Sequence, residues 1–306
     1  MEDMPMNQEK SITNEENQEK KEILQPKNDV VFKALFTRGK ESITKALIED
    51  ILKIKIHKLD LDKSKDLLND NKKDKNGRLD LRALLNDNIE CDIEIQLSTH
   101  DKVLERFLDY WSKIYASNLE IGNKYDKLRQ TISIIIIDDE IKQFSEIKKA
   151  YTKWQIREEE YRNIILTSYF QICIIELPKA IKEYEKNKND EVLQWMKFLD
   201  NPEDTEVEKI MEENQDIKEA KKELEKISQD KRLRIMAIRA DLERRDYEQC
   251  LYEARRDGKA EGRAEGVQNE KKEIAIKMLQ EKMDIKVITK VTGLTEEEIK
   301  KLSMEE

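Results

Sequence analysis

The chain has 306 residues, of which 41% are charged and 38% hydrophobic, with only 7 glycines and 4 prolines. Such a length is enough for two domains with separate cores, and the scarcity of turn residues favours long solvated helices over an all-β architecture. No apolar run approaches the roughly 20 residues that cross a bilayer, and the polar N-terminus lacks the apolar core of a signal peptide. We therefore expect a helix-rich cytoplasmic protein with no membrane partner.

Cysteine and histidine are too few and too scattered for a zinc site. Cys91, Cys173 and Cys250 match neither a zinc-ligand spacing nor an even set of disulfides, and we expect them to be buried apolar residues. His57 and His100 are the only histidines, so chemistry built on several imidazoles lacks its parts. Any metal should be held by oxygen ligands.

The net charge of −9 argues at first against a nucleic-acid partner, because the phosphate backbone selects for positive surface. Two segments hold this acidity: residues 1–24 carry seven acids and three bases, and residues 200–230 carry twelve acids and five bases. The net charge of the rest of the chain is about +2. The charge of the protein therefore does not exclude DNA as a partner.

Residues 1–24 have few apolar side chains and no periodicity, which is typical of a disordered acidic tail. A capped helix is expected to start at Asn28 and Asp29, and apolar residues recur at helical spacing as far as Leu52. Residues 63–76 are rich in Lys, Asp and Asn, which indicates an exposed loop.

Two segments of period-two alternation, Leu79–Leu85 and Ile89–Gln96, flank the turn cluster Asn86–Asn88 and predict a β-hairpin. Further elements follow in chain order. We expect a helix over residues 100–122, a buried strand over 131–137, a charged helix over 140–162 and a second apolar strand over 169–177. This order indicates an α/β core with a sheet flanked by helices.

Beyond Pro178 the pattern is helical throughout, so we expect a core domain over residues 25–180 and a helical region over 181–306. Residues 218–283 read as nearly continuous helix. They contain three glycines spaced four apart, at positions 258, 262 and 266. Each costs about 1 kcal/mol relative to alanine inside a helix, which favours close helix packing and a homo-oligomer over a flexible joint.

The C-terminal end has the outline of a helix-turn-helix. A helix over Asp284–Thr292 and a Gly293 turn precede Thr295–Leu302, which begins with the form of a capping box. Because Glu296, Glu297 and Glu298 make the second helix acidic, it is a poor reader of DNA. We expect this end to serve helix packing or oligomerisation in preference to DNA binding.

Turn length sets the register of the hairpin. With a three-residue turn, Leu85 faces Ile89, and by the same count Asp80 faces Glu94. A two-residue turn would mix polar and apolar side chains on each face. Directly opposed side chains have Cβ atoms about 4.5–5.5 Å apart, and like charges there are destabilising unless something neutralises them.

A divalent cation would neutralise this carboxylate pair. Two carboxylates, a carbonyl oxygen such as that of Ile95, and waters suit Mg²⁺ or Mn²⁺, which can polarise a phosphodiester and activate water. Gln96 lies on the face of Glu94 and can orient water or a phosphate oxygen, but it cannot supply positive charge or act as a general base. The alternative is a polar face whose carboxylates are offset by Arg78 and Arg82.

Nine segments of the chain are similar, in order, to those of one family. They are Asn28–Lys33, Gly77–Asp80, Asp92–Leu97, Arg106–Tyr115, Gly122–Tyr125, Ile175–Lys179, Trp195–Leu199, Gly258–Gly266 and Val291–Leu294. Together they resemble the PD-(D/E)XK nuclease family transposases, also called recombination-promoting nucleases. The resemblance spans about residues 25–302.

The resemblance implies a restriction-endonuclease-like core, magnesium-dependent cleavage of DNA and a link to mobile elements or recombination. By position, Asp80 and Glu94 become the metal ligands, and Gln96 takes the place of a residue that is usually lysine. Leu79 stands where the motif name has proline, and Gln96 lacks the charge of lysine, which leaves the water-activating step open. Asp29 is a further acidic candidate, with a helix cap as the alternative.

Arg106, Tyr110 and Lys113 lie three or four residues apart on the helix after the hairpin, where we expect them to bind the substrate. Arg106 either holds a phosphate or pairs with a hairpin carboxylate. The sequence thus predicts a metal-dependent DNA endonuclease. A catalytically weakened DNA-binding or protein-interaction module is the alternative, and a structural scaffold built on residues 181–306 is a third possibility.

Overall fold

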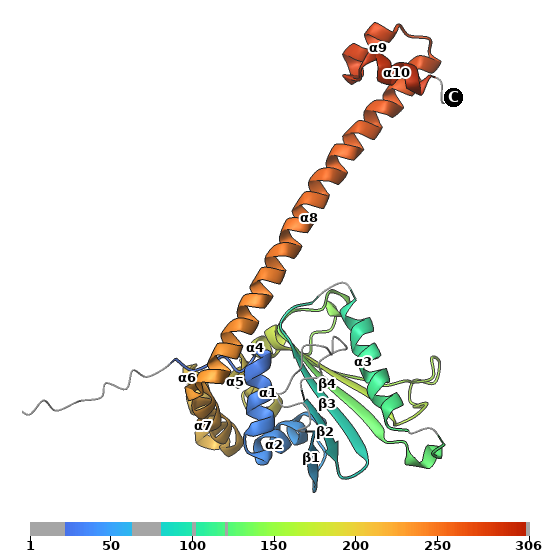
Figure 1. Cartoon of the computed structure of the whole chain (residues 1–306). Helices are drawn as coiled ribbons and strands as arrows, with labels where there is room; N and C mark the ends of the chain where they lie inside the picture. Colours follow the sequence, from blue (N-terminus) through green and yellow to red (C-terminus); the bar gives the residue numbers. More distant parts are fainter. Residues whose placement is uncertain (1–21, 63–80, 100–101, 120–121, 304–306) are drawn as a thin grey trace, which may run out of the picture. The chain divides into compact units, whose positions relative to one another are not determined.

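The computed structural model describes residues 22–62, 81–99, 102–119 and 122–303. Contacts divide the chain into two units, Met1–Ala240 and Asp241–Glu306 (Figure 1). The boundary expected near residue 180 therefore lies inside the first unit. Among the described helices, none has the length and apolar character of a membrane span.

A mixed sheet of six strands forms the centre of the first unit, as the α/β prediction required (Figure 1). In spatial order the strands are β1 (Leu59–Leu61), β2 (Leu81–Leu85), β3 (Ile89–Gln96), β4 (Gln130–Ile137), β6 (Phe170–Glu176) and β5 (Tyr151–Trp154). The strands β3, β4 and β6 run parallel, while β1, β2 and β5 pair antiparallel with their neighbours.

Helices cover both faces of the sheet. One face packs into the main core with helices from both ends of this unit, namely α1 (Asp29–Arg38), α2 (Glu41–Leu52), α4 (Leu177–Tyr184), α5 (Glu191–Asp200), α6 (Thr205–Glu213) and α7 (Gln215–Gln229). The other face packs against α3 (Val103–Ser117), which buries Phe107 beside Ile135 and Ile137. The indole of Trp111 also donates to the carbonyl of Thr131 at 2.9 Å. The sheet and α3 thus enclose a second, smaller core.

Two helices lie within the segments where the sequence predicted them. The Asn28 side chain caps α1 by accepting from the backbone amides of Val30 and Val31. An Asn cap satisfies amide groups that have no partner inside the helix. The α3 helix, expected within residues 100–122, runs from Val103 to Ser117.

The prediction of a charged helix over residues 140–162 is wrong. This segment holds a short 3-10 turn, Lys142–Phe144, then β5, and then an antiparallel bridge between Arg157 and Ile165. Strand β5 pairs with the open edge of β6, with Tyr151 opposite Ile175. The hydrogen bonds of that edge outweigh the local helical pattern, and the sequence of the segment alone does not reveal the edge.

The second unit holds the end of α8 (Lys231–Gln280) with α9 (Ile285–Thr292) and α10 (Glu296–Leu302). Ala275, Ile288, Leu294 and Ile299 form its core. Gly293 ends α9 in the left-handed conformation with φ 72°, and α10 begins with the predicted capping box. The nearly continuous helix predicted over 218–283 is present as α7 and α8, with a break at Asp230 and an end at Gln280.

The environment of the cysteines differs from the expectation in one case. Cys91 and Cys173 are buried, but Cys250 is exposed on α8. Its neighbours Leu251 and Tyr252 are also exposed, 39% and 65% of their surfaces being accessible. A buried role therefore holds for two of the three thiols.

Candidate metal and phosphate site

The hairpin has the register that the three-residue turn predicted. Leu85 lies opposite Ile89, and Arg82 opposite Asp92. Asn86 adopts a left-handed backbone with φ 50°, as does the next turn residue, a conformation that Asn and Asp tolerate better than most residues. The Asn86 carboxamide also accepts from the backbone amide of His57 at 2.8 Å and donates to the carbonyl of Lys55 at 3.0 Å, which ties the turn to the chain before β1.

Asp80 lies outside the described residues, in the segment 63–80. Its opposition to Glu94 therefore stays a prediction. The register of the described strand β2 is the one on which that prediction depends, because Leu81 pairs with Ile93.

Strand β3 places its acids on a single face. Cys91, Ile93 and Ile95 belong to the main core, so the alternating residues Glu90, Asp92 and Glu94 face the side of α3. All three acids are buried, with exposed fractions of 6%, 1% and 6%. Burying several carboxylates in a row is costly, so each needs compensation.

Two arginines neutralise the charge of Glu90. Its two carboxylate oxygens accept from Arg129 at 2.7 Å and from Arg82 at 3.2 Å. The alternative stated from the sequence, in which arginines offset the carboxylates of this face, therefore applies to Glu90. The sequence did not indicate Glu90 as the partner of Arg82.

Among the described residues, Glu94 has fewer charge partners than Glu90. Its Oε1 accepts from Arg106 Nη2 at 3.3 Å, a long contact, and the side chain is only 8% exposed. Burial raises the pKa of Glu94 to about 7, against a smaller lowering by the Arg106 charge. Burial therefore disfavours the ionised form of Glu94, and a carboxyl whose pKa is raised in this way is a candidate functional residue.

Gln96 is held in a fixed orientation beside Glu94. Its Nε2 donates to the carbonyl of Ser98 at 2.9 Å, and its Oε1 accepts from Arg106 Nη2. The amide oxygen therefore points toward the same guanidinium that Glu94 contacts. The sequence left two roles open for Arg106, and the pairing with a hairpin carboxylate is present.

The other two predicted substrate-binding residues extend from Arg106 along α3. The guanidinium of Arg106 lies 5.6 Å from the centroid of the Tyr110 ring, and Lys113 Nζ lies 5.8 Å from the same ring. Lys113 also pairs with Asp109 at 2.6 Å. Tyr110 thus lies between two cations on the half-exposed side of the helix.

Asp29 has the position of a helix-start residue. It is exposed, it belongs to the first turn of α1, and its Oδ1 accepts from the backbone amide of Val30 at 2.8 Å. The neighbouring Asn28 provides the cap and donates to the carbonyl of Ala237 at 3.2 Å. These contacts account for both side chains at the start of the helix.

The donor set fits a hard divalent cation. Glu94 offers a buried carboxylate and Gln96 an oriented amide oxygen, and oxygen ligands of this kind suit Mg²⁺ and Mn²⁺. Within the described ranges, no three His, Cys, Asp or Glu residues form a group that could hold a metal. A complete site therefore requires a ligand beyond those ranges, such as Asp80, or water.

A buried ion pair next to this site was not anticipated from the sequence. Glu176 ends β6, level with Gln96 across the intervening Ile137 of β4. It is 1% exposed, and its Oε2 lies 2.6 Å from Lys179 Nζ. The only sequence signal was an acid and a base three residues apart at a strand–helix junction.

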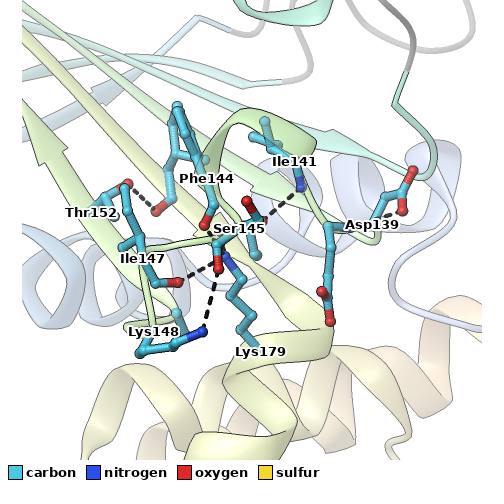
Figure 2. Close-up of polar contacts among 12 residues, drawn as sticks. Asp139, Ile141, Phe144, Ser145, Ile147, Lys148, Thr152 and Lys179 are labelled. Carbon is cyan, nitrogen blue, oxygen red and sulfur yellow. Dashed lines mark hydrogen bonds and ion pairs between the residues drawn. The ribbon is translucent and has the colours of Figure 1, made fainter.

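This pair fastens the loop that follows β4. Lys179 Nζ donates to the carbonyls of Phe144 at 2.9 Å and Ile147 at 3.0 Å, as Figure 2 shows. Glu176 Oε1 accepts from the backbone amide of Ile141 at 2.7 Å. All these contacts are internal, so the segment Ile175–Lys179, noted in the sequence for its resemblance, has a structural role here.

Comparison with known families agrees with the fold and with the resemblance. The family model described as PD-(D/E)XK nuclease family transposase matches residues 26–254, and that described as Rpn/YhgA-like nuclease family, C-terminal HTH domain, matches residues 268–304. Searches of curated proteins and of solved structures each found no match. The chain belongs to the PD-(D/E)XK nuclease family transposases.

Proposed function

We propose that this member of the PD-(D/E)XK nuclease family is a metal-dependent DNA endonuclease of the cytoplasm, linked to recombination or mobile elements. The observation that carries the proposal is Glu94. It is buried on the sheet with its pKa raised to about 7, next to an oriented amide and beneath a helix that carries cationic side chains. Clusters of this kind occur at catalytic sites more often than elsewhere.

In this proposal Asp80 and Glu94 would hold Mg²⁺ or Mn²⁺. The ion would supply Lewis-acid chemistry and lower the pKa of water. Gln96 would orient a water or a phosphate oxygen through its amide. Arg106 and Lys113 attract the DNA backbone, and Tyr110 packs against both cations.

A plasmid-nicking assay tests the site. Asp80→Ala and Glu94→Ala should each abolish cutting in Mg²⁺, because each removes a proposed metal ligand. Glu105→Gln is the matched control, since Glu105 is an exposed acid on the same helix as Arg106, paired with Lys102 at 3.0 Å. Undiminished cutting by the two alanine variants would refute the assignment.

A second candidate function is a nuclease-like DNA-binding or protein-interaction module without full activity. Gln96 favours it, because an amide cannot replace the charge of lysine or act as a base. Calorimetry with Mn²⁺ separates the two functions. If the intact protein binds no metal and retains DNA in the presence of chelator, the second candidate function is correct.

We also propose that the chain self-associates through its C-terminal helices. The glycines of the α8 stripe, Gly258, Gly262 and Gly266, are exposed, and apart from adjacent residues and the nearby backbone of α8 no described atom lies within 4 Å of where a Cβ would be. The chain's own described packing therefore does not explain them. A bare glycine stripe lets another helix approach closely.

Charge supports a parallel pairing of two copies. Each of the first two glycines is followed by a base, Lys259 or Arg263, and each of the last two is preceded by an acid, Glu261 or Glu265. Successive helical residues are about 100° apart, so bases flank one side of the stripe and acids the other. In a parallel pair opposite flanks meet, whereas in an antiparallel pair like flanks meet.

Mixing experiments test this pairing by light scattering. Lys259→Glu with Arg263→Glu makes both flanks acidic, and Glu261→Lys with Glu265→Lys makes both basic. Each double variant alone should dissociate, and the mixture should associate. A monomeric parent protein would refute the proposal. The C-terminal α9–α10 pair, whose helix α10 starts with three acids, is assigned to helix packing in the same proposal.

A further inference from the structure

A single nitrogen of Arg106 joins the two polar side chains of the candidate site. Arg106 Nη2 contacts Glu94 Oε1 at 3.3 Å and also contacts Gln96 Oε1. Both acceptor oxygens come from alternate residues of β3, so they lie on one face of the strand. The guanidinium thus occupies the position from which a metal cation would contact both Glu94 Oε1 and Gln96 Oε1.

The three side chains differ in their freedom to move. The side chain of Glu94 is 8% exposed, and Gln96 is tied to the Ser98 carbonyl. Arg106 is 26% exposed and lies in the first turns of α3, where the ring of Tyr110 is 5.6 Å from its guanidinium carbon. An aromatic face is a favourable environment for a guanidinium, and Tyr110 already provides one beside Arg106. Arg106 is therefore the member of the three that can leave.

We infer that Arg106 is an exchangeable counter-cation of this site. It offsets the charge of Glu94 while the site holds no metal, and it gives up Glu94 Oε1 when a divalent cation binds. The inference rests on the proposed metal site. Two cations cannot share one oxygen-lined position at contact distance, because their repulsion is strong where water is largely excluded.

The exchange unites the two roles that the sequence left open for Arg106. Without metal, its charge is used by a carboxylate and it has little to offer a phosphate. After exchange, the guanidinium presents its forked donors on the half-exposed side of α3, where a phosphate oxygen can accept from them. Arg106 is in this view a positioning residue that makes phosphate binding depend on metal binding.

Calorimetric titration of the full chain with Mn²⁺, in the absence of DNA, tests the exchange. Arg106→Gln removes the competing charge, so it should tighten Mn²⁺ binding by about fivefold or more, the lower end of typical coupling between competing ligands. Lys102→Gln is the matched control, because it makes the same charge change at the start of the same helix, where Lys102 pairs with Glu105. The control should bind Mn²⁺ as the parent does.

The outcomes separate this inference from the metal site on which it rests. If Glu94→Gln binds Mn²⁺ as well as the parent, the site itself is wrong. If Glu94→Gln loses binding while Arg106→Gln binds Mn²⁺ equally or more weakly than the parent, only the exchange is overturned. Should Arg106→Gln not fold, judged by circular dichroism, Arg106→Ala and Arg106→Met carry the same expectation. If none of these Arg106 variants binds Mn²⁺ more tightly than the parent, the exchange is also overturned.

Discussion

Glu94→Gln should stabilise the metal-free protein in alkaline solution. The pKa of Glu94 is about 7 in the fold against an ordinary value of 4.5, so ionised Glu94 opposes folding. Each pKa unit corresponds to about 1.4 kcal/mol, which makes the cost at high pH about 3 kcal/mol as an order of magnitude. Glutamine removes this cost and keeps an oxygen for Arg106 to contact.

The sign of the pH dependence follows from proton binding. Because the folded state binds the Glu94 proton more tightly, the cost is absent below the unfolded pKa, grows as pH rises towards 7, and is complete above it. Urea unfolding with chelator, at about pH 5 and about pH 8, should therefore show a gain for the variant mainly at the higher pH.

Glu90→Gln is the control for burial on the same face. Glu90 is as buried as Glu94, but it has two arginine partners, at 2.7 and 3.2 Å. Its replacement should destabilise the protein at the higher pH, since the arginines lose their counter-charge. A Glu94→Gln variant with the same change in stability at both pH values, or with lower stability at the higher one, would refute the reasoning.

Three further predictions concern the supporting structure. Lys179→Met leaves Glu176 buried without its cation and should cost about 3–5 kcal/mol in urea unfolding, whereas the exposed Lys182→Met should cost little; equal costs would contradict the role of the pair. Asn28→Ala removes the cap of α1 and should lower stability by about 1 kcal/mol, and an unchanged unfolding midpoint would contradict it. Gly262→Ala should raise the helicity measured by circular dichroism, since alanine is favoured by about 1 kcal/mol in a helix, yet weaken self-association in light scattering; stronger association would contradict the glycine contact.

The features that the sequence determined are local ones. The hairpin follows from period-two alternation, and its register follows from the turn Asn86–Asn88, because a shift by one residue would exchange the buried and polar faces. The cap at Asn28 and the capping box at Thr295 follow from side chains that bond amides a few residues away. Each of these depends on neighbours in the chain.

Tertiary structure decided the features that depend on distant partners. Tyr151–Trp154 is a strand because β6 offers an open edge. The core extends past residue 180 because α5 packs against α2, where the Trp195 indole donates to Asp50 Oδ2 at 2.8 Å.

The candidate site shows the same division. The sequence identified Glu94, Gln96 and Arg106 as neighbours on a strand and on the following helix. Only the fold buried Glu94 enough to raise its pKa, and only the fold placed one guanidinium nitrogen against two side chains. Burial and the choice among partners depend on how whole elements pack, and a pattern along one strand does not contain that information.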